Sequence, residues 1–324
     1  MSAPVKLVWG AAMVSPHPET GELTHVHQTL DLLRSLGVED LDTAQIYGDA
    51  EETLGKVKVA DKKFTISTKQ GAGFKPGTGN KEGVLEHGAY ASEKLGPIDI
   101  YYLHAPDASI PLEDTLEGIQ KLYETGAFKR FGLSNYLPED IQKVYDITSA
   151  KGWVKPTVFQ GNYNPFARAQ ETTTFPLLRK LGIAFYAYSP LAGGLLAKTK
   201  EQLAAAAGRW TPGTMLGDIY RTMYDKEELR NALDDWEKTA NKEGISLAEL
   251  GYRWVRYHSS LDSQYGDGVI FGAYDEARIK QTVGWLNNGP LSEEAVKSID
   301  AIWDKIKDVA PIDNYNSIHK PKPN

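Results

Sequence analysis

The chain contains no cysteine, and it has neither a long apolar run nor a cluster of basic residues. Without cysteine there is no disulfide, no thiolate nucleophile and no thiolate-based metal site, and a reducing compartment is permitted. The apolar stretch Val5–Val14 is too short to cross a bilayer and lacks a basic start, so we interpret it as a first strand and expect no membrane partner. The net charge of -7 argues against nucleic acid. These absences favour a cytoplasmic protein.

Strand-like apolar runs alternate with amphipathic, helix-like stretches such as 111–125 and 137–150. The chain has 324 residues, 41% of them hydrophobic, which is enough for a large buried core. Eight such runs in this length favour a (β/α)8 TIM barrel over an open sheet. The expected strands are residues 5–13, 40–45, 63–69, 98–104, 128–134, 157–162, 183–189 and 267–272. We expect a single domain over residues 1–324, with a long loop after strand 7, at 192–225, and a C-terminal helix and tail.

Four of these segments end on polar residues that can carry chemistry. They are Leu41–Gly48, Ile66–Lys69, Tyr101–Pro106 and Gly132–Tyr136. Each changes from apolar to polar, as a buried strand does where it opens into a functional loop. Active sites of (β/α)8 barrels lie at the carboxyl ends of the strands, so we expect these polar side chains to converge there.

The polar residues at these strand ends suit a site that reduces carbonyl groups. Addition of a hydride to a carbonyl carbon leaves an alkoxide that must receive a proton, and a free tyrosine with a pKa near ~10 releases one reluctantly. Lys69 beside Tyr47 would favour the phenolate and lower that pKa, and Asp42 would hold the lysine charged and in place. His104 would orient the carbonyl oxygen or relay the proton. Tyr47 and His104 are thereby also expected to contact the substrate.

Three other motifs favour ordinary structural roles. The glycine-rich segment Gly71–Gly77 misses the dinucleotide fingerprint, so we predict a mobile loop at the barrel mouth. His25 and His27 would point apart on a helix, which argues against a metal site. The segment Gly132–Tyr136 fails the nucleophile-elbow pattern because its last residue is not glycine. We therefore predict no metal and no hydrolase chemistry.

Longer motifs resemble those of a known family. The motifs are Leu41–Ala44, Tyr102–Asp107, Gly132–Tyr136, Pro156–Gly161 and Phe185–Leu196. They are similar to aldo-keto reductase sequences, and within that superfamily to the aflatoxin-aldehyde reductase branch. The resemblance runs nearly end to end, and it implies an NADPH-dependent reductase barrel.

The resemblance also implies roles for individual residues. Asp42, Tyr47, Lys69 and His104 match the catalytic tetrad, with Tyr47 as the proton donor. Other positions match those that hold the carboxamide, the nicotinamide ring and the phosphates of NADP. The positions implied for the cofactor are Gly10, Ala11, Ala12, Ser134, Asn135, Gln160, Tyr188, Ser189, Pro190, Leu191, Ala192, Gly193, Gly194, Gly272, Tyr274, Arg278, Gln281 and Thr282.

Physical chemistry supports several of these cofactor positions. An amide needs donors and acceptors, which Asn135 and Gln160 provide, and the face of Tyr188 can shield one side of the nicotinamide. Gly193 and Gly194 allow backbone N–H groups to approach the pyrophosphate closely. The carboxamide, the ring and the pyrophosphate thus each have residues of suitable type.

Two arginines and the residues around them bear on cofactor and substrate choice. Arg278 follows the last expected strand, where the resemblance places the adenosine phosphate, and a guanidinium binds a 2′-phosphate through paired hydrogen bonds. The nearby Asp275 and Glu276 would repel a phosphate, and Thr282 stands where the family usually has asparagine. Arg221 matches an arginine near the cofactor or an acidic substrate. We expect NADPH to be preferred over NADH.

Two functions from different classes stay open. The first is a working reductase of aldehydes or ketones, serving either detoxification or one step of a biosynthetic pathway. The second is a non-catalytic, redox-sensing cofactor-binding subunit that resembles the potassium-channel β subunits, which share the fold and the tetrad. The match to the aflatoxin-aldehyde branch favours the enzyme. The partner is then a small-molecule carbonyl substrate, and a homodimer stays open.

Overall fold

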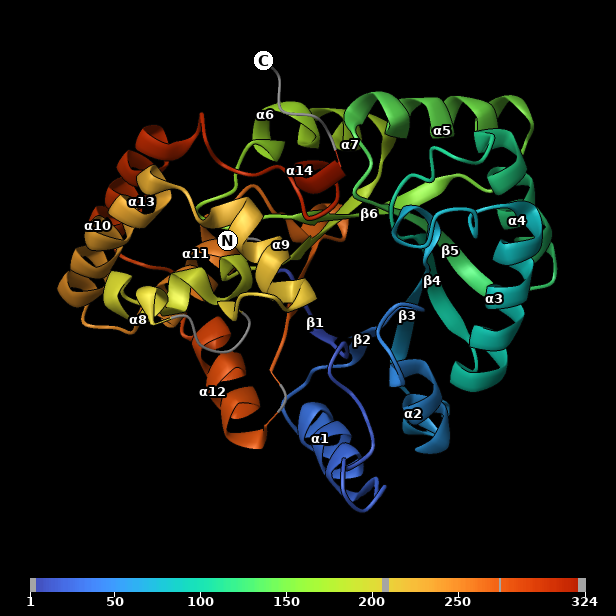
Figure 1. Cartoon of the computed structure of the whole chain (residues 1–324), viewed down its shortest axis with the longest axis horizontal. Helices are drawn as coiled ribbons and strands as arrows, with labels where there is room; N and C mark the ends of the chain where they lie inside the picture. Colours follow the sequence, from blue (N-terminus) through green and yellow to red (C-terminus); the bar gives the residue numbers. More distant parts are fainter. Residues whose placement is uncertain (1–3, 206–209, 274, 320–324) are drawn as a thin grey trace.

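The eight expected strands form one closed parallel barrel (Figure 1). The structure is a computed structural model that describes residues 4–205, 210–273 and 275–319. Neighbouring strands pair in sequence order, and the ring closes where β8 pairs with β1. The strands are β1 (Lys6–Gly10), β2 (Asp40–Asp42), β3 (Thr65–Gln70), β4 (Ile98–Leu103), β5 (Phe128–Ser134), β6 (Pro156–Asn162), β7 (Ala184–Tyr188) and β8 (Gly268–Phe271). The predicted (β/α)8 barrel is confirmed.

Helices surround the strands, with α3, α4 and α5 on one side of the barrel and α10 and α13 on the opposite side (Figure 1). The 3-10 helices are η1 (Val59–Lys62), η2 (Ala72–Phe74), η3 (Ala192–Ala197) and η5 (Ser263–Tyr265). The α-helices are α1 (Thr24–Ser35), α2 (Ala50–Lys56), α3 (Lys81–Leu95), α4 (Leu112–Glu124), α5 (Pro138–Ala150), α6 (Gln170–Thr173), α7 (Phe175–Leu181), α8 (Lys200–Ala204), α9 (Met215–Tyr224), α10 (Glu227–Glu243), α11 (Leu247–Tyr257), α12 (Glu276–Asn287), α13 (Glu293–Ile306) and α14 (Asn316–His319). No helix within the described ranges has both the length and the apolar character that a bilayer crossing requires.

Apolar side chains pack on both faces of the sheet. Successive side chains of a strand point to opposite faces, so Tyr101 of β4 belongs to the large cluster under the helices and Tyr102 to the small cluster inside the barrel. The inner cluster is completed by Val8, Ile100, Val158, Ala184, Tyr186 and Ile270. This double burial explains why the strands have near-continuous apolar sequences.

Polar residues fix where several helices begin. The side chains of Asn80, Ser246 and Ser292 each accept a hydrogen bond from a backbone N–H in the first turn of α3, α11 and α13, respectively. Such a cap satisfies one otherwise unpaired donor and contributes about 1 kcal/mol. The helix starts are therefore determined locally, while the apolar faces determine how the helices pack.

The connection after β7 and the C-terminal tail depart from the simple repeat. Much of the expected excursion 192–225 is helical, because it contains η3, α8 and α9; residues 206–209 lie outside the described part of the chain. The tail follows α13 and ends in α14, which lies beside α9. Tyr315 and Asn316 of the tail contact the loops that follow β4 and β5. The tail therefore returns to the carboxyl-end mouth of the barrel.

Candidate active site

The strand ends bring the predicted catalytic residues together. Asp42 ends β2, Lys69 lies in β3, His104 follows β4, and Tyr47 lies in the loop between β2 and α2. Lys69 Nζ donates to Asp42 Oδ2 at 2.5 Å and to the carbonyl oxygen of Thr43 at 2.9 Å. Lys69 is fully buried, and a buried ammonium persists only when such partners compensate its lost hydration. The pair thus fixes a positive charge at the mouth of the barrel.

Tyr47 contacts both this charge and His104. Lys69 Nζ lies 4.9 Å from the centroid of the Tyr47 ring. The rings of Tyr47 and His104 meet edge to face, with their centroids 5.8 Å apart. The phenol and the imidazole are therefore direct neighbours at the mouth of the barrel.

The protonation of Tyr47 and Lys69 follows from burial and from their mutual interaction. Burial raises the pKa of Tyr47 above its ordinary value, although the charge of Lys69 acts in the opposite direction. The net direction is thus opposite to the lowering that the sequence predicts, because burial outweighs the lysine. Burial lowers the pKa of Lys69, but Asp42 and Tyr47 overcome this and leave that pKa above its ordinary value. At neutral pH, Tyr47 is a neutral phenol and Lys69 is a cation.

His104 is a neutral imidazole at neutral pH. Burial, and then the charge of Lys69, hold the pKa of His104 well below its ordinary value. Its Nδ1 atom is buried and has no hydrogen-bond partner among the described residues. The Phe74 ring packs edge-on against the imidazole, with centroids 4.9 Å apart, and so restrains its orientation. The imidazole can therefore contribute a hydrogen bond to a bound ligand without carrying charge.

The glycine-rich segment Gly71–Gly77 lies at this mouth and includes η2. A Cβ on Gly73 would lie 2.2 Å from the carbonyl oxygen of Pro106, so this part of the segment packs tightly against the chain that follows His104. Such a close backbone approach is open only to glycine. The segment places Phe74 beside His104.

Amide groups at the ends of β5 and β6 join the tetrad. Asn135 Nδ2 donates to the carbonyl oxygen of His104 at 2.8 Å and to Ser134 Oγ at 3.2 Å. Gln160 Nε2 donates to Asp42 Oδ1 at 2.9 Å. Ser134, Asn135 and Gln160 are all buried. Their hydrogen bonds bring these three predicted carboxamide-binding residues together beside the tetrad. Ser134 Oγ and Gln160 Oε1 keep hydrogen-bonding capacity for a further amide.

Tyr188 is held by Asn135 and by the C-terminal tail. Its hydroxyl lies 2.8 Å from Asn135 Oδ1 and 3.0 Å from Asn314 Oδ1. Asn316 Nδ2 donates to the carbonyl oxygen of Asn135 at 2.9 Å. The tail therefore fixes two residues of the predicted nicotinamide site.

The predicted pyrophosphate loop, Ser189–Gly194, is a series of tight turns after β7. Positive φ angles occur at Ser189 (52°), Ala192 (51°), Gly193 (66°) and Gly194 (96°). The first two are unfavourable for side chains with a Cβ, and such strain concentrates at functional sites. A Cβ on Gly193 would lie 2.3 Å from the Tyr220 ring of α9, so glycine is required there sterically as well. Such turns can direct successive backbone N–H groups toward an anion.

The predicted adenosine-phosphate residues lie at the start of α12. Arg278 Nε is 3.1 Å from Asp275 Oδ2, while Asp275 Oδ1 accepts a hydrogen bond from the backbone N–H of Arg278 and caps the helix. Gln281 is exposed, and Thr282 is buried on the face that packs toward the core. Arg278 and Gln281 are thus accessible to a ligand, whereas Thr282 faces the protein interior.

The remaining predicted cofactor positions follow the ends of β1 and β8. Gly10–Ala12 begins at the end of β1, and the backbone N–H of Ala11 donates to the carbonyl oxygen of Asp42 at 2.8 Å. Gly272 directly follows β8 and is exposed. Tyr274 lies outside the described residues. Both described segments are at the carboxyl end of the barrel, as expected.

The predicted substrate residue Arg221 lies on α9. Its Nη2 atom is 3.1 Å from Asp225 Oδ2, and Asp225 also pairs with Arg230. Because α9 packs against η3 and α14, Arg221 belongs to the helix that borders the pyrophosphate loop and the tail. The structure therefore places this arginine on a helix that packs against the pyrophosphate loop and the tail, with its guanidinium paired to Asp225.

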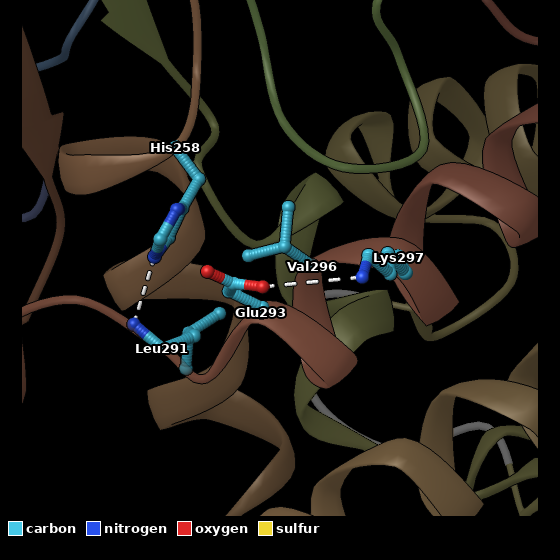
Figure 2. Close-up of a pocket in the computed structure, with 5 residues that line it drawn as sticks. All are labelled: His258, Leu291, Glu293, Val296 and Lys297. Atoms are coloured by element: carbon cyan, nitrogen blue, oxygen red, sulfur yellow. Dashed lines mark hydrogen bonds and ion pairs between the residues drawn. The ribbon is translucent and has the colours of Figure 1, made fainter.

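Figure 2 shows a surface pocket that is separate from this site. It is lined by His258, Leu291, Glu293, Val296 and Lys297. His258 Nε2 accepts the backbone N–H of Leu291 at 2.7 Å, and Lys297 pairs with Glu293. His258 follows the end of α11, before the chain enters β8, so this pocket is on the amino-end side. Its polar groups pair with each other, and nothing in it adds to the site at the mouth.

The comparison with known proteins agrees with this geometry. The family model described as "Aldo/keto reductase family" matches residues 6–304. The chain belongs to the aldo/keto reductase family. Its eight-stranded barrel, with the Asp42–Lys69 pair at the mouth, is thus the barrel of an oxidoreductase family.

Named relatives of this aldo/keto reductase extend over most of the chain. Oxidoreductase sirO of Leptosphaeria maculans is 37% identical over 319 residues, which cover 95% of this chain and 96% of the relative. Aflatoxin B1 aldehyde reductase member 2 of Rattus norvegicus is 33% identical over 297 residues, covering 86% of this chain and 79% of that protein. Aldo-keto reductase pigE of Monascus ruber is 30% identical over 305 residues, 88% of each chain. The predicted resemblance to the aflatoxin-aldehyde reductase branch is confirmed.

Several residues around the site of this aldo/keto reductase were not predicted from the sequence. Phe74 contacts His104, and Tyr315 packs edge-on against Phe74 with centroids 5.2 Å apart. Asn314 is hydrogen-bonded to the Tyr188 hydroxyl, and Asn316 donates to the carbonyl oxygen of Asn135. The tail segment 313–316 carried no usable signal in the sequence, because asparagine and aspartate are ordinary residues of exposed connecting segments.

Proposed function

We propose that this protein is an NADPH-dependent reductase that converts an aldehyde or ketone to an alcohol, with Tyr47 as the proton donor. The observation that carries the proposal is the fully buried Lys69, paired with Asp42 and lying beside the Tyr47 ring. A buried ion pair next to a phenol has a clear chemical use where a phenolate must form. Family membership supports the reaction class.

The described residues fit a nicotinamide cofactor. The evidence for the fit is the amide set Ser134, Asn135 and Gln160 beside the tetrad, and the strained turns of Ser189–Gly194. Tyr188 would cover one face of the ring, and Arg278 would meet the adenosine phosphate. When bound, NADPH would supply the hydride. The chain's own residues would then hold the carboxamide, the ring and the phosphates at separate places along the mouth.

The protein residues divide the remaining chemistry between them. Tyr47 gives its phenolic proton to the oxygen of the carbonyl group as negative charge develops there. Lys69 stabilises the phenolate left behind, and Asp42 keeps the lysine in place. His104, neutral because of its lowered pKa, orients the carbonyl oxygen by a hydrogen bond. The apolar ring of Phe74 beside His104 helps to exclude water from the reacting groups.

The substrate class is a small-molecule carbonyl compound. The names of the relatives include aflatoxin B1 aldehyde reductase, which supports an aldehyde, and oxidoreductase sirO, which names no substrate. Arg221 at the edge of the site would favour a substrate with an acidic group. A chain without cysteine depends on no disulfide and is compatible with a reducing compartment, and we place the protein in the cytoplasm.

An NADPH-oxidation assay tests the proposal directly. The purified chain is mixed with NADPH and a panel of aldehydes and ketones, and the loss of NADPH absorbance is followed with and without carbonyl compound. Turnover that depends on the carbonyl compound is expected. Tight NADPH binding without turnover on any member of the panel would instead support the redox-sensing subunit, the alternative that resembles potassium-channel β subunits.

The selectivity for NADPH is expected to depend on Arg278. NADPH carries a 2′-phosphate, and a guanidinium gains roughly 1.5–3 kcal/mol from each charge-assisted hydrogen bond to such a group. We expect the wild type to bind NADPH at least about tenfold more tightly than NADH, which corresponds to about 1.4 kcal/mol. Arg278→Ala should remove most of that difference. Fluorescence titration of both nucleotides measures it.

The ion pair between Arg278 and Asp275 provides a second arm for this test. Asp275→Asn keeps an oxygen to cap α12 but removes the charge that repels a phosphate and competes for the guanidinium. It should tighten NADPH binding and leave NADH binding unchanged. For Arg278→Ala the matched control is Lys297→Ala, because Lys297 is an exposed cation at the other end of the barrel. Equal affinities in the wild type, or an unchanged NADPH affinity in Arg278→Ala, would rule out Arg278 as the selector.

A further inference from the structure

A second buried cluster of ionisable groups lies outside the site described above. Glu51 of α2 and His87 of α3 are 4% and 3% exposed, and they meet Thr68 of β3 and Tyr101 of β4, which are fully buried. Burying a carboxylate is unfavourable unless partners replace its hydration, whereas apolar residues fill such a layer without that cost. The polar cluster therefore calls for an explanation beyond packing.

Every polar side chain of the cluster has a partner. Thr68 Oγ1 donates to Glu51 Oε1 at 2.5 Å, and His87 Nε2 lies 3.2 Å from both Glu51 oxygens. His87 Nδ1 is 2.9 Å from the Tyr101 hydroxyl, whose oxygen also lies 3.2 Å from the carbonyl oxygen of Val84. The cluster thus links two helices and two strands through directional bonds.

The proton arrangement in the cluster is constrained by the phenol. The Tyr101 hydroxyl has one proton, which goes either to the carbonyl oxygen of Val84 or to His87 Nδ1. In both cases His87 Nε2 lies within hydrogen-bonding distance of the Glu51 carboxylate, and this contact links α2 to α3.

The cluster lies directly behind the tetrad. Side chains alternate along a strand, so Thr68 points outward to α2 while the next residue, Lys69, points to the tetrad. On α2, Glu51 lies in the first turn, and the backbone N–H of Ala50 donates to the carbonyl oxygen of Tyr47 at 3.1 Å. The bond between Thr68 and Glu51 therefore connects the strand that carries Lys69 to the helix that begins beside Tyr47.

We propose that Glu51 and His87 are positioning residues for Tyr47. Their cluster fixes the start of α2 to the outer face of β3 and β4, and this holds the Tyr47 ring at its short separation from Lys69 and His104. The inference rests on the proposed function, since it matters for turnover only if Tyr47 is the proton donor. Neither residue touches the substrate or the reacting atoms.

The first test separates kcat from binding in variants of the full chain. Glu51→Gln keeps the size of the side chain and an acceptor for Thr68 but removes the charge that His87 meets. We expect it to lower kcat about tenfold, because sub-ångström misplacement of a reacting group has large kinetic effects, while the NADPH affinity stays within about twofold. Thr68→Val, which removes one bond and no charge, should act in the same direction with a smaller factor. Glu52→Gln, an exposed neighbour paired with Lys56, is the matched control and should change nothing.

A double variant shows whether the effect passes through Tyr47. In a Tyr47→Phe background, Glu51→Gln should cause no further loss of kcat, because the group being positioned has gone. A loss that is fully additive to that of Tyr47→Phe would overturn the proposal. A general loss of stability would instead lower NADPH affinity and turnover alike, in both backgrounds.

Amide hydrogen exchange provides a readout that needs no activity. Glu51→Gln should speed exchange in residues 44–56, which contain the Tyr47 loop and α2, and Glu52→Gln should not. Unchanged exchange there would overturn the proposal even if kcat falls. If the wild type reduces no carbonyl compound, the proposed function fails, and the exchange result alone decides whether the cluster holds the Tyr47 loop.

Discussion

Replacing Tyr47 with phenylalanine will lower kcat for carbonyl reduction by a factor on the order of 10² or more, the usual effect of losing a general acid. The fold and the NADPH affinity should persist, because only one hydroxyl is removed. The two tetrad residues described beside Tyr47 cannot take over the role. Lys69 is already bonded to Asp42 and Thr43, and His104 is held neutral by its lowered pKa.

The measurement combines NADPH oxidation at saturating substrate with fluorescence titration of NADPH. Tyr90→Phe is the control, since Tyr90 is an exposed tyrosine on α3 that lies away from the mouth of the barrel. It should leave both kcat and NADPH affinity unchanged. An unchanged kcat in Tyr47→Phe would refute the assignment of Tyr47 as the acid.

The convergence of Asp42, Lys69 and His104 could be predicted from the sequence because the barrel topology determines most of their placement. Asp42, Lys69 and His104 each stand at or just after the end of an apolar strand, and a closed parallel barrel gathers all carboxyl ends at one mouth. The approximate strand positions needed only hydrophobic pattern and turn residues, although β1 and β2 end three residues earlier than expected, at Gly10 and Asp42. The relative placement of these side chains then followed without any knowledge of distances.

The C-terminal wall of the site could not be predicted in the same way. Tyr188 and Asn314 are hydrogen-bonded although they are 126 residues apart, and no local pattern specifies that pairing. The tail lacks the periodicity that reveals a strand or a long helix, so its return across the mouth depends on tertiary packing alone. Phe74 was hidden for a related reason, since its contact with His104 depends on the path of a glycine-rich segment.

Burial was the other quantity that the sequence did not supply. The net pKa direction of Tyr47 depends on how completely the ring is enclosed, and enclosure wins over the charge of Lys69. Likewise, Glu51 and His87 lie on amphipathic helices where charged residues are usually solvated, and only the packing of α2 on α3 shows that they are buried. The sequence therefore indicated which residue types carry the chemistry, but it did not indicate how far they are buried or in which direction burial shifts the pKa of Tyr47.

Replacing Lys69 with methionine is expected to lower kcat by a factor on the order of 10². Lys69 Nζ lies 4.9 Å from the centroid of the Tyr47 ring. A unit charge at roughly this separation contributes ~3 kcal/mol at an effective dielectric constant near 20, and about 1.4 kcal/mol corresponds to tenfold in rate. The lysine favours the phenolate, so its loss moves the pKa of Tyr47 further in the direction set by burial. Tyr47 then becomes a poorer acid for reduction.

The pH dependence shows this direction most clearly in alcohol oxidation. Tyr47 must accept a proton there, so the wild-type rate rises as the pH approaches the pKa of Tyr47 from below. In Lys69→Met the pKa is higher, so the rise moves to more alkaline pH and the rate at any pH below both pKa values is lower. The measurement is the hydride-transfer rate under single-turnover conditions across the pH range in which both proteins stay folded. An unaltered profile would contradict the electrostatic role of Lys69.

Two further variants keep this test independent of folding. Lys69→Met leaves the Asp42 carboxylate buried without its cation, and breaking a buried pair in this way costs about 3–5 kcal/mol of stability. The double variant Lys69→Met/Asp42→Asn removes both charges, so it should recover stability while keeping the profile shifted to alkaline pH. Asp42→Asn alone retains the lysine charge, and it should therefore lose less activity and keep a pH-dependent rate. If Asp42→Asn, which retains the charge of Lys69, lost as much activity as the two variants without it, the charge of Lys69 would have no part in the chemistry of Tyr47.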